Sequence, residues 1–144
     1  TSNYQAQVNQ GYGKDEAISL WFKVVYVPID RIMGEIINVF PAKLKDLSAD
    51  PYDDELMATF CEFIEKSQKK LKKIKDVYQS LKTPLEAKHF SLSLYQCFSE
   101  LQDGINEWER YTAGYVENYL HDGNEMLRKA KKKRLLLKKE KIIF

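Results

Sequence analysis

"PYDDELMATFCEFIEKSQKKLKKIKDVYQSLK", residues 51–82, is the stretch that decides the fold. Its apolar and small side chains recur at alternating steps of three and four residues for almost four heptads, which is typical of a helix with one buried seam. Asp50 as N-cap and Pro51 in the first helical position mark a start, so the pattern predicts one long helix over 51–82. The seam consists of Met57, Phe60, Ile64, Ser67, Leu71, Ile74, Tyr78 and Leu81.

A second long helix is predicted over residues 84–120. Thr83, Pro84 and Glu86 have the spacing of a capping box with proline in the first turn. The turn signal HDGN, residues 121–124, predicts the end of this helix and a shorter fourth helix from Glu125. The second seam consists of Leu94, Cys97, Leu101, Ile105, Trp108, Thr112, Tyr115 and Tyr119.

The N-terminal third predicts a further helix over residues 15–40, because its apolar side chains keep helical spacing. Pro28 opposes a straight helix, and WFKVVYV, residues 21–27, has the β-branched and aromatic composition of a strand. A lone strand would leave its backbone groups unpaired. We therefore predict a helix kinked at Pro28, or two helices meeting there, with Pro41 and residues 45–50 forming the link to the next helix.

Together these segments predict an all-α, antiparallel, up-and-down four-helix bundle with three long helices and a short basic C-terminal helix. The 144 residues match one domain in length, which we place at 15–144 after a flexible, polar N-terminal segment at 1–14. No apolar run approaches the ~18 residues of a membrane span. The chain begins with Thr1, so a processed and tethered form stays open.

The two cysteines, Cys61 and Cys97, are predicted to be unpaired. The expected hairpin offsets them by about 12 Å along the bundle, whereas a disulfide needs Cα atoms within ~7 Å. Free thiols favour a reducing compartment such as the cytoplasm, and an exported form stays open.

Charge is unevenly spread along the chain. Residues 1–122 carry 14 Lys and Arg against 19 Asp and Glu, whereas residues 123–144 carry 9 against 2. Lysine outnumbers arginine 19 to 4, which favours a solvated face or diffuse attraction to anions over bidentate recognition of phosphates or bases. The candidate partner-binding or anion-binding residues are Lys66, Lys69, Lys70, Lys73, Lys131, Lys132, Lys133, Arg134 and Lys138.

These two basic clusters are expected to approach one another. With a turn at residue 121, residue 141 would lie near the level of residues 103 and 63, which predicts a diffuse anion-binding zone near the middle of the bundle. The C-terminal helix is a poor membrane anchor, because its apolar side chains cover more than half of its circumference with Lys139 and Glu140 among them.

An aromatic stripe at helical spacing is formed by Trp108, Tyr111, Tyr115 and Tyr119. Large aromatics at this spacing usually fill a core, and the alternative is a docking face for a partner or small ligand.

No metal, cofactor or catalytic residue is predicted. Glu86 and His89 have the Glu-x-x-His spacing of di-iron bundles, but a second copy of this motif is absent from the sequence. His89 and Cys97 are eight residues apart on one helix, too far to form a catalytic pair. We therefore interpret the chain as a non-enzymatic protein-interaction module that binds a protein partner or self-associates. The alternatives are a binder of anionic lipid or nucleic acid surfaces and a small-ligand bundle.

Overall fold

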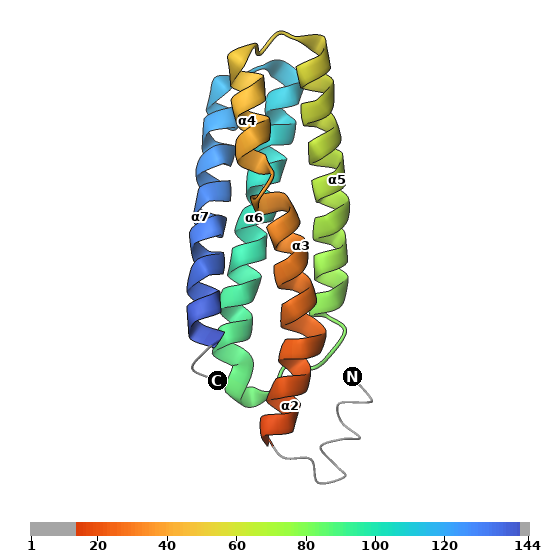
Figure 1. Ribbon diagram of the computed structural model, residues 1–144, viewed down its shortest axis with the longest axis vertical. Helices are drawn as coiled ribbons and strands as arrows, with labels where there is room; N and C mark the ends of the chain where they lie inside the picture. Colours follow the sequence, from red (N-terminus) through yellow and green to blue (C-terminus); the bar gives the residue numbers. More distant parts are fainter. Residues whose placement is uncertain (1–13, 142–144) are drawn as a thin grey trace.

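The computed structural model describes residues 14–141, which form an all-helical bundle without strands in this range (Figure 1). The predicted flexible segment 1–14 lies outside the described residues, apart from Lys14, which begins the first helix. The elements are α2 (Lys14–Trp21), η1 (Phe22–Tyr26), α3 (Val27–Ile37), α4 (Phe40–Ala49), α5 (Asp54–Tyr78), η2 (Leu85–Ala87), α6 (Lys88–Gly114) and α7 (Glu117–Lys141). The prediction of an all-α, antiparallel bundle is confirmed.

The first arm of the bundle is continuous helix from α2 through η1 to α3. The disturbance expected at Pro28 takes the form of a π-helical turn, η1, that comes just before it, and Pro28 occupies the first turn of α3. A wider turn accommodates a proline, which has no N–H and would otherwise crowd the carbonyl one turn back. Residues 21–27 are helical, which excludes the strand that their composition would suit.

The prediction that Pro41 and residues 45–50 form a link is wrong, because this segment is the helix α4. The chain turns at Asn38 and Val39, and Pro41 then lies in the first turn of the new helix, where a missing N–H costs nothing. Phe40 and Leu47 are buried against the rest of the bundle. Their burial stabilises a helix that local composition does not indicate.

The seam that predicts α5 is confirmed. Five of its positions are buried along the helix: Phe60, Ile64, Ser67, Leu71 and Ile74. The ends differ from the predicted 51–82. The N-cap is Asp53, which accepts a hydrogen bond from the backbone N–H of Leu56 at 2.9 Å, whereas Asp50 accepts one from Tyr52 in the preceding turn.

The second helical hairpin differs more from expectation. The N-cap positions of η2 and α6 are Pro84 and Ala87, not the predicted Thr83, and neither makes a side-chain cap hydrogen bond. α6 ends at Gly114, and Tyr115 adopts a left-handed conformation with φ of 58° that reverses the chain. The turn predicted at residues 121–124 is wrong, because these residues lie inside α7.

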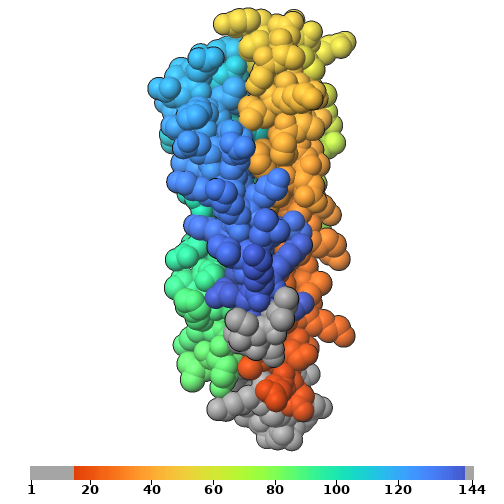
Figure 2. Space-filling model, turned by 60° about the vertical axis from the view of Figure 1, so that its left-hand side comes forward, coloured from red at the N-terminus to blue at the C-terminus, as the bar shows by residue number. Residues whose placement is uncertain are grey.

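Consequently α7 is not short. It has 25 residues, as many as α5, and it runs antiparallel to the 27 residues of α6. In the bundle, α5 and α7 occupy opposite corners, with α6 behind and the α3–α4 arm in front (Figure 1). Turned by 60°, the molecule shows α7 exposed along the surface between α6 and the α3–α4 arm (Figure 2).

Candidate functional site

The inner side of α7 is joined to α3 by an ion pair. The Nε of Arg134 donates to Oδ1 of Asp30 at 2.8 Å, and both side chains are less than one-fifth exposed. The guanidinium lies against Gly34, where a Cβ atom would come within 2.7 Å of Nη2. Arg134, predicted as a candidate for binding partners or anions, is thus occupied within the fold.

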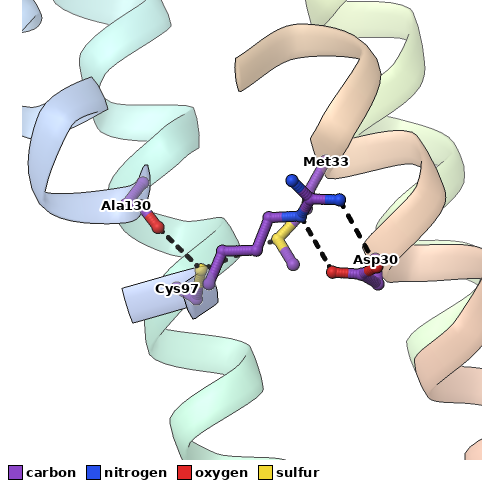
Figure 3. Close-up of polar contacts among 5 residues, drawn as sticks. Asp30, Met33, Cys97 and Ala130 are labelled. Atoms are coloured by element: carbon purple, nitrogen blue, oxygen red, sulfur yellow. Dashed lines mark hydrogen bonds and ion pairs between the residues drawn. The ribbon is translucent and has the colours of Figure 1, made fainter. Parts of the chain in front are cut away.

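A sulfur-containing layer lies beside this pair and joins α3, α6 and α7 (Figure 3). The thiol of Cys97 donates to the backbone carbonyl of Ala130 at 3.4 Å and lies 3.7 Å from the sulfur of Met33. Burial raises the pKa of the Cys97 thiol to about 12. Because the thiolate is the reactive form of cysteine, burial and the raised pKa both disfavour reaction at the Cys97 thiol. Both cysteines are unpaired as predicted, and Cys61 is half-buried.

The hydroxyl of Tyr26 faces the same region. Its pKa is raised to about 12, first by burial and then by the negative charge of Asp30. The ammonium of Lys141 lies 5.4 Å from the centre of the Tyr26 ring, a cation–π contact that holds the last turn of α7 against η1. The basic end of α7 is helical up to Lys141.

The outer side of α7 forms a groove with α6. The groove has a volume of about 450 Å³ and is lined by Ser93, Gln96, Lys133, Leu136, Leu137, Lys139 and Glu140. Leu137 is buried and forms part of its floor, whereas Leu136 is 59% exposed. An exposed leucine at the edge of a hollow is the kind of apolar surface that a partner can cover.

The α7 side of the groove is rich in cations. Residues 126–141 of α7 contain nine Lys and Arg and one Glu. Lys133 is paired with Glu100 across the two helices, and Glu140 lies 3.8 Å from the imidazole of His89. Within residues 14–141, Lys132 and Lys139 make no ion pair and are exposed. They remain available to a ligand, as do Lys131 and Lys138, which are also exposed.

The candidate lysines of α5 lie away from the groove between α6 and α7 (Figure 1). Lys66 pairs with Glu62 at 2.8 Å, and this contact lowers the pKa of the Glu62 carboxyl. Lys70 pairs with Glu35 of α3 at 3.5 Å. Lys69 and Lys73 are exposed, as expected for a solvated helix face.

The expected approach of the two basic clusters is wrong. α7 begins at residue 117 and not after 121, so His89 and not residue 103 lies beside its residue 140. In addition, α5 and α7 occupy opposite corners of the bundle (Figure 1). The structure therefore does not join the clusters into one anion-binding zone.

The aromatic stripe is divided between core and surface. Trp108 is fully buried beside Phe60, with ring centres 4.8 Å apart, and its Nε1 donates to the carbonyl of Leu120 at 3.0 Å. Tyr111 is also buried, and burial raises the pKa of its hydroxyl. Tyr115 is 45% exposed and stacks with Tyr52 at the end of the bundle.

Tyr119 completes this stripe and is half-buried, with the guanidinium of Arg110 lying 5.9 Å from its ring centre. The four aromatics do not form one face. The core interpretation holds for Trp108 and Tyr111, which are 0% and 3% exposed.

Metal ligands do not gather in the described part of the chain, where no group of three or more His, Cys, Asp or Glu side chains is placed to hold an ion. Among the same residues, no helix is both long and apolar enough to cross a membrane.

The groove itself was missed by sequence reasoning. Its signal is the run Leu135 to Leu137, because a helix that packs on one side cannot bury three consecutive side chains. The structure buries Leu137 and leaves Leu135 and Leu136 more than half exposed. Which of the three faces the core depends on the register of α7 against α6.

Fold and groove together define an all-α bundle domain. Its last helix is basic and is packed against the bundle on its inner side and exposed on its outer side. The chain belongs to the family described as "Cyanobacterial DnaJ chaperone, C-terminal domain", which matches residues 13–142. The comparison with curated proteins and the comparison with solved structures gave no match.

Proposed function

We propose that this domain is a non-enzymatic protein-interaction module of a DnaJ chaperone and that it binds a segment of another protein in the groove between α6 and α7. The observation that carries the proposal is the 450 Å³ groove with exposed Leu136 at its edge. Apolar hollows rimmed by polar residues are characteristic of binding sites on soluble domains. The family description supports a chaperone context.

The proposal of a non-enzymatic role is supported by the state of Cys97. Its thiol is buried, its pKa is raised to about 12, and it is hydrogen-bonded within the core. The groove offers Lys133, Lys139 and Glu140, but Lys133 is already paired with Glu100. These groups are suited to orienting a bound chain.

Binding of a permanently unfolded protein tests the proposal. The probe is fluorescently labelled, reduced and carboxymethylated α-lactalbumin, followed by anisotropy at about 0.15 M salt, where attraction between distant charges is largely screened. We expect the wild-type domain to bind and the variant Leu136→Asp to bind at least about fivefold more weakly, since losing one apolar anchor costs about 1 kcal/mol or more.

The matched control is Leu85→Asp. Leu85 is 73% exposed, lies in η2 and does not line the groove, so this variant should bind like wild type. Equal weakening by both substitutions, or no binding by the wild-type domain, would contradict the proposal. Thermal unfolding followed by circular dichroism shows whether each variant is folded.

A further inference from the structure

The groove beside Leu136 continues along the two helices. A second hollow of about 340 Å³ is lined by Tyr95, Gln96, Ser99, Glu100, Asp103, Met126, Lys129 and Lys133. Because Gln96 and Lys133 line both hollows, the surface between α6 and α7 is hollowed from Met126 to Glu140. At 1.5 Å per residue this stretch of α7 is about 21 Å long, which matches about 14 residues of helix.

The walls of this groove present side chains to a ligand and almost no free backbone N–H or C=O groups for hydrogen bonding. Its lining residues lie within α6 and α7, where backbone N–H and C=O groups bond to one another along each helix. An extended segment laid over Leu136 and Met126 would have backbone groups without partners. A helix brings its backbone already paired, and its ridges can fit the groove between two antiparallel helices.

The lysines beside the groove indicate the charge of the segment that would bind in it. Lys139 lines the first hollow, and Lys132 lies outside both hollows, one turn before Leu136 on α7. The two lysines are seven residues apart with Leu136 between them, so all three point to one side of the helix. Both lysines are exposed, and no ion pair joins either of them to another described residue. A helix with carboxylates seven residues apart can reach both ammonium groups while its apolar stripe covers Leu136.

We infer that the groove binds an amphipathic α-helix of about 14 residues that carries acidic side chains at heptad spacing. This inference rests on the proposed function and specifies the partner of the same site. A membrane surface fits less well, because Leu127, Ala130 and Leu137 of α7 are buried in the bundle. The two exposed leucines of α7 stand among lysines and form no continuous apolar face.

The test uses three capped synthetic peptides with the same leucine stripe. The first has Glu at two positions seven residues apart, the second has Gln there and the third has Lys. We expect the Glu peptide to bind wild-type protein most tightly by anisotropy, about fivefold or more over the Gln peptide, and to gain helical circular dichroism on binding. Equal binding of the three peptides would overturn the inference.

Charge reversal sharpens this test. In the double variant Lys132→Glu and Lys139→Glu, the preference should invert in favour of the Lys peptide by about tenfold. The control double variant Lys69→Glu and Lys73→Glu changes two exposed lysines of α5 at the opposite corner of the bundle and should keep the wild-type order. Inversion in both double variants would mean diffuse attraction and overturn the inference.

Two further outcomes distinguish the inference from the proposed function. Leu136-dependent binding of unfolded α-lactalbumin without any preference among the peptides would overturn the inference and leave the function standing. Loss of both would overturn both. Vesicles of phosphatidylcholine and phosphatidylserine supply a third arm, since flotation of the protein with them, abolished by Lys132→Glu and Lys139→Glu while peptides fail to bind, would assign this face to an anionic membrane.

Discussion

Arg134 and Asp30 are 104 residues apart in the sequence, and the Nε of the first donates to Oδ1 of the second at 2.8 Å. The pair ties α7 to α3, and the guanidinium of Arg134 lies against Gly34. The inner side of α7 is thereby held in place, while its outer side carries the groove. Stability of the fold and availability of the candidate site depend on the same helix.

The ion pair should contribute measurably to stability. Asp30→Ala leaves a mostly buried guanidinium without its carboxylate and should lower the free energy of unfolding by about 1–3 kcal/mol. Arg134→Met, which keeps an apolar stem over Gly34, should cost less. Urea unfolding of both single variants and the double variant completes a double-mutant cycle. A coupling energy near zero would show that the two residues act independently.

Two glycines should respond in opposite directions to the same substitution. A Cβ at Gly123 would come within 2.7 Å of the Trp108 indole nitrogen and 2.8 Å of the Gly104 carbonyl oxygen, so Gly123→Ala should destabilise by about 2 kcal/mol or more. At Gly114 the nearest atom is 4.0 Å away, and Ala there should be neutral or stabilising by up to about 1 kcal/mol. Similar melting temperatures for the two variants would contradict the close packing of α6 on α7.

The left-handed backbone of Tyr115 should favour glycine. Tyr115→Gly and Tyr115→Ala both remove the ring that stacks on Tyr52, so the difference between them isolates the cost of a φ of 58° for a residue with a Cβ atom. We expect the Gly variant to be more stable by about 1 kcal/mol. A more stable Ala variant would mean that the chain reversal at residue 115 is not as described.

Alkaline pH should destabilise the fold through two buried groups. The pKa of Cys97 is raised from 9.0 to about 12 and that of Tyr26 from 10.0 to about 12. Above about pH 9 the unfolded chain therefore releases protons that the folded chain retains, so stability falls as pH rises from about 9 towards 12. Chemical denaturation across this range should show a shallower decline for Tyr26→Phe than for wild type. An unchanged slope would count against burial of this hydroxyl.

The same burial predicts two rates of thiol modification. Cys61 is half-buried and Cys97 is fully buried, so iodoacetamide should label Cys61 in the native protein and Cys97 only after unfolding. Mass spectrometry of timed samples measures both sites in one experiment. Comparable native rates would show that the layer around Met33 and Ala130 opens readily.

The limits of sequence reasoning can be traced to particular residues. The seam from Phe60 to Ile74 specifies a buried helix face because periodicity is a local property of one helix. The sequence predicts a turn at residues 121–124 because Gly123 resembles a helix stop, whereas in the fold Gly123 is the small residue on which Trp108 packs. The actual break at Tyr115 has a left-handed tyrosine, which local turn chemistry does not indicate.

The candidate site was only partly visible in the sequence. The basic character of residues 126–141 can be read from composition, but Arg134 is paired with Asp30 and Lys133 with Glu100. Lys132 and Lys139 remain on the outer side. Whether a cation of α7 is paired or free depends on which residues of α3 and α6 lie next to it. The sequence of α7 alone does not contain that information.

What the sequence determined by itself is that the fold is all-α, which positions of α5 repeat at helical spacing, and that the last helix is rich in lysine and arginine. Helical spacing and backbone hydrogen bonding act over a few residues, so they can be read locally. What only the tertiary structure decided is the register of α7 against α6. That register buries Leu137, exposes Leu136, pairs Arg134 with Asp30 and opens the groove, because packing joins residues that no local pattern relates.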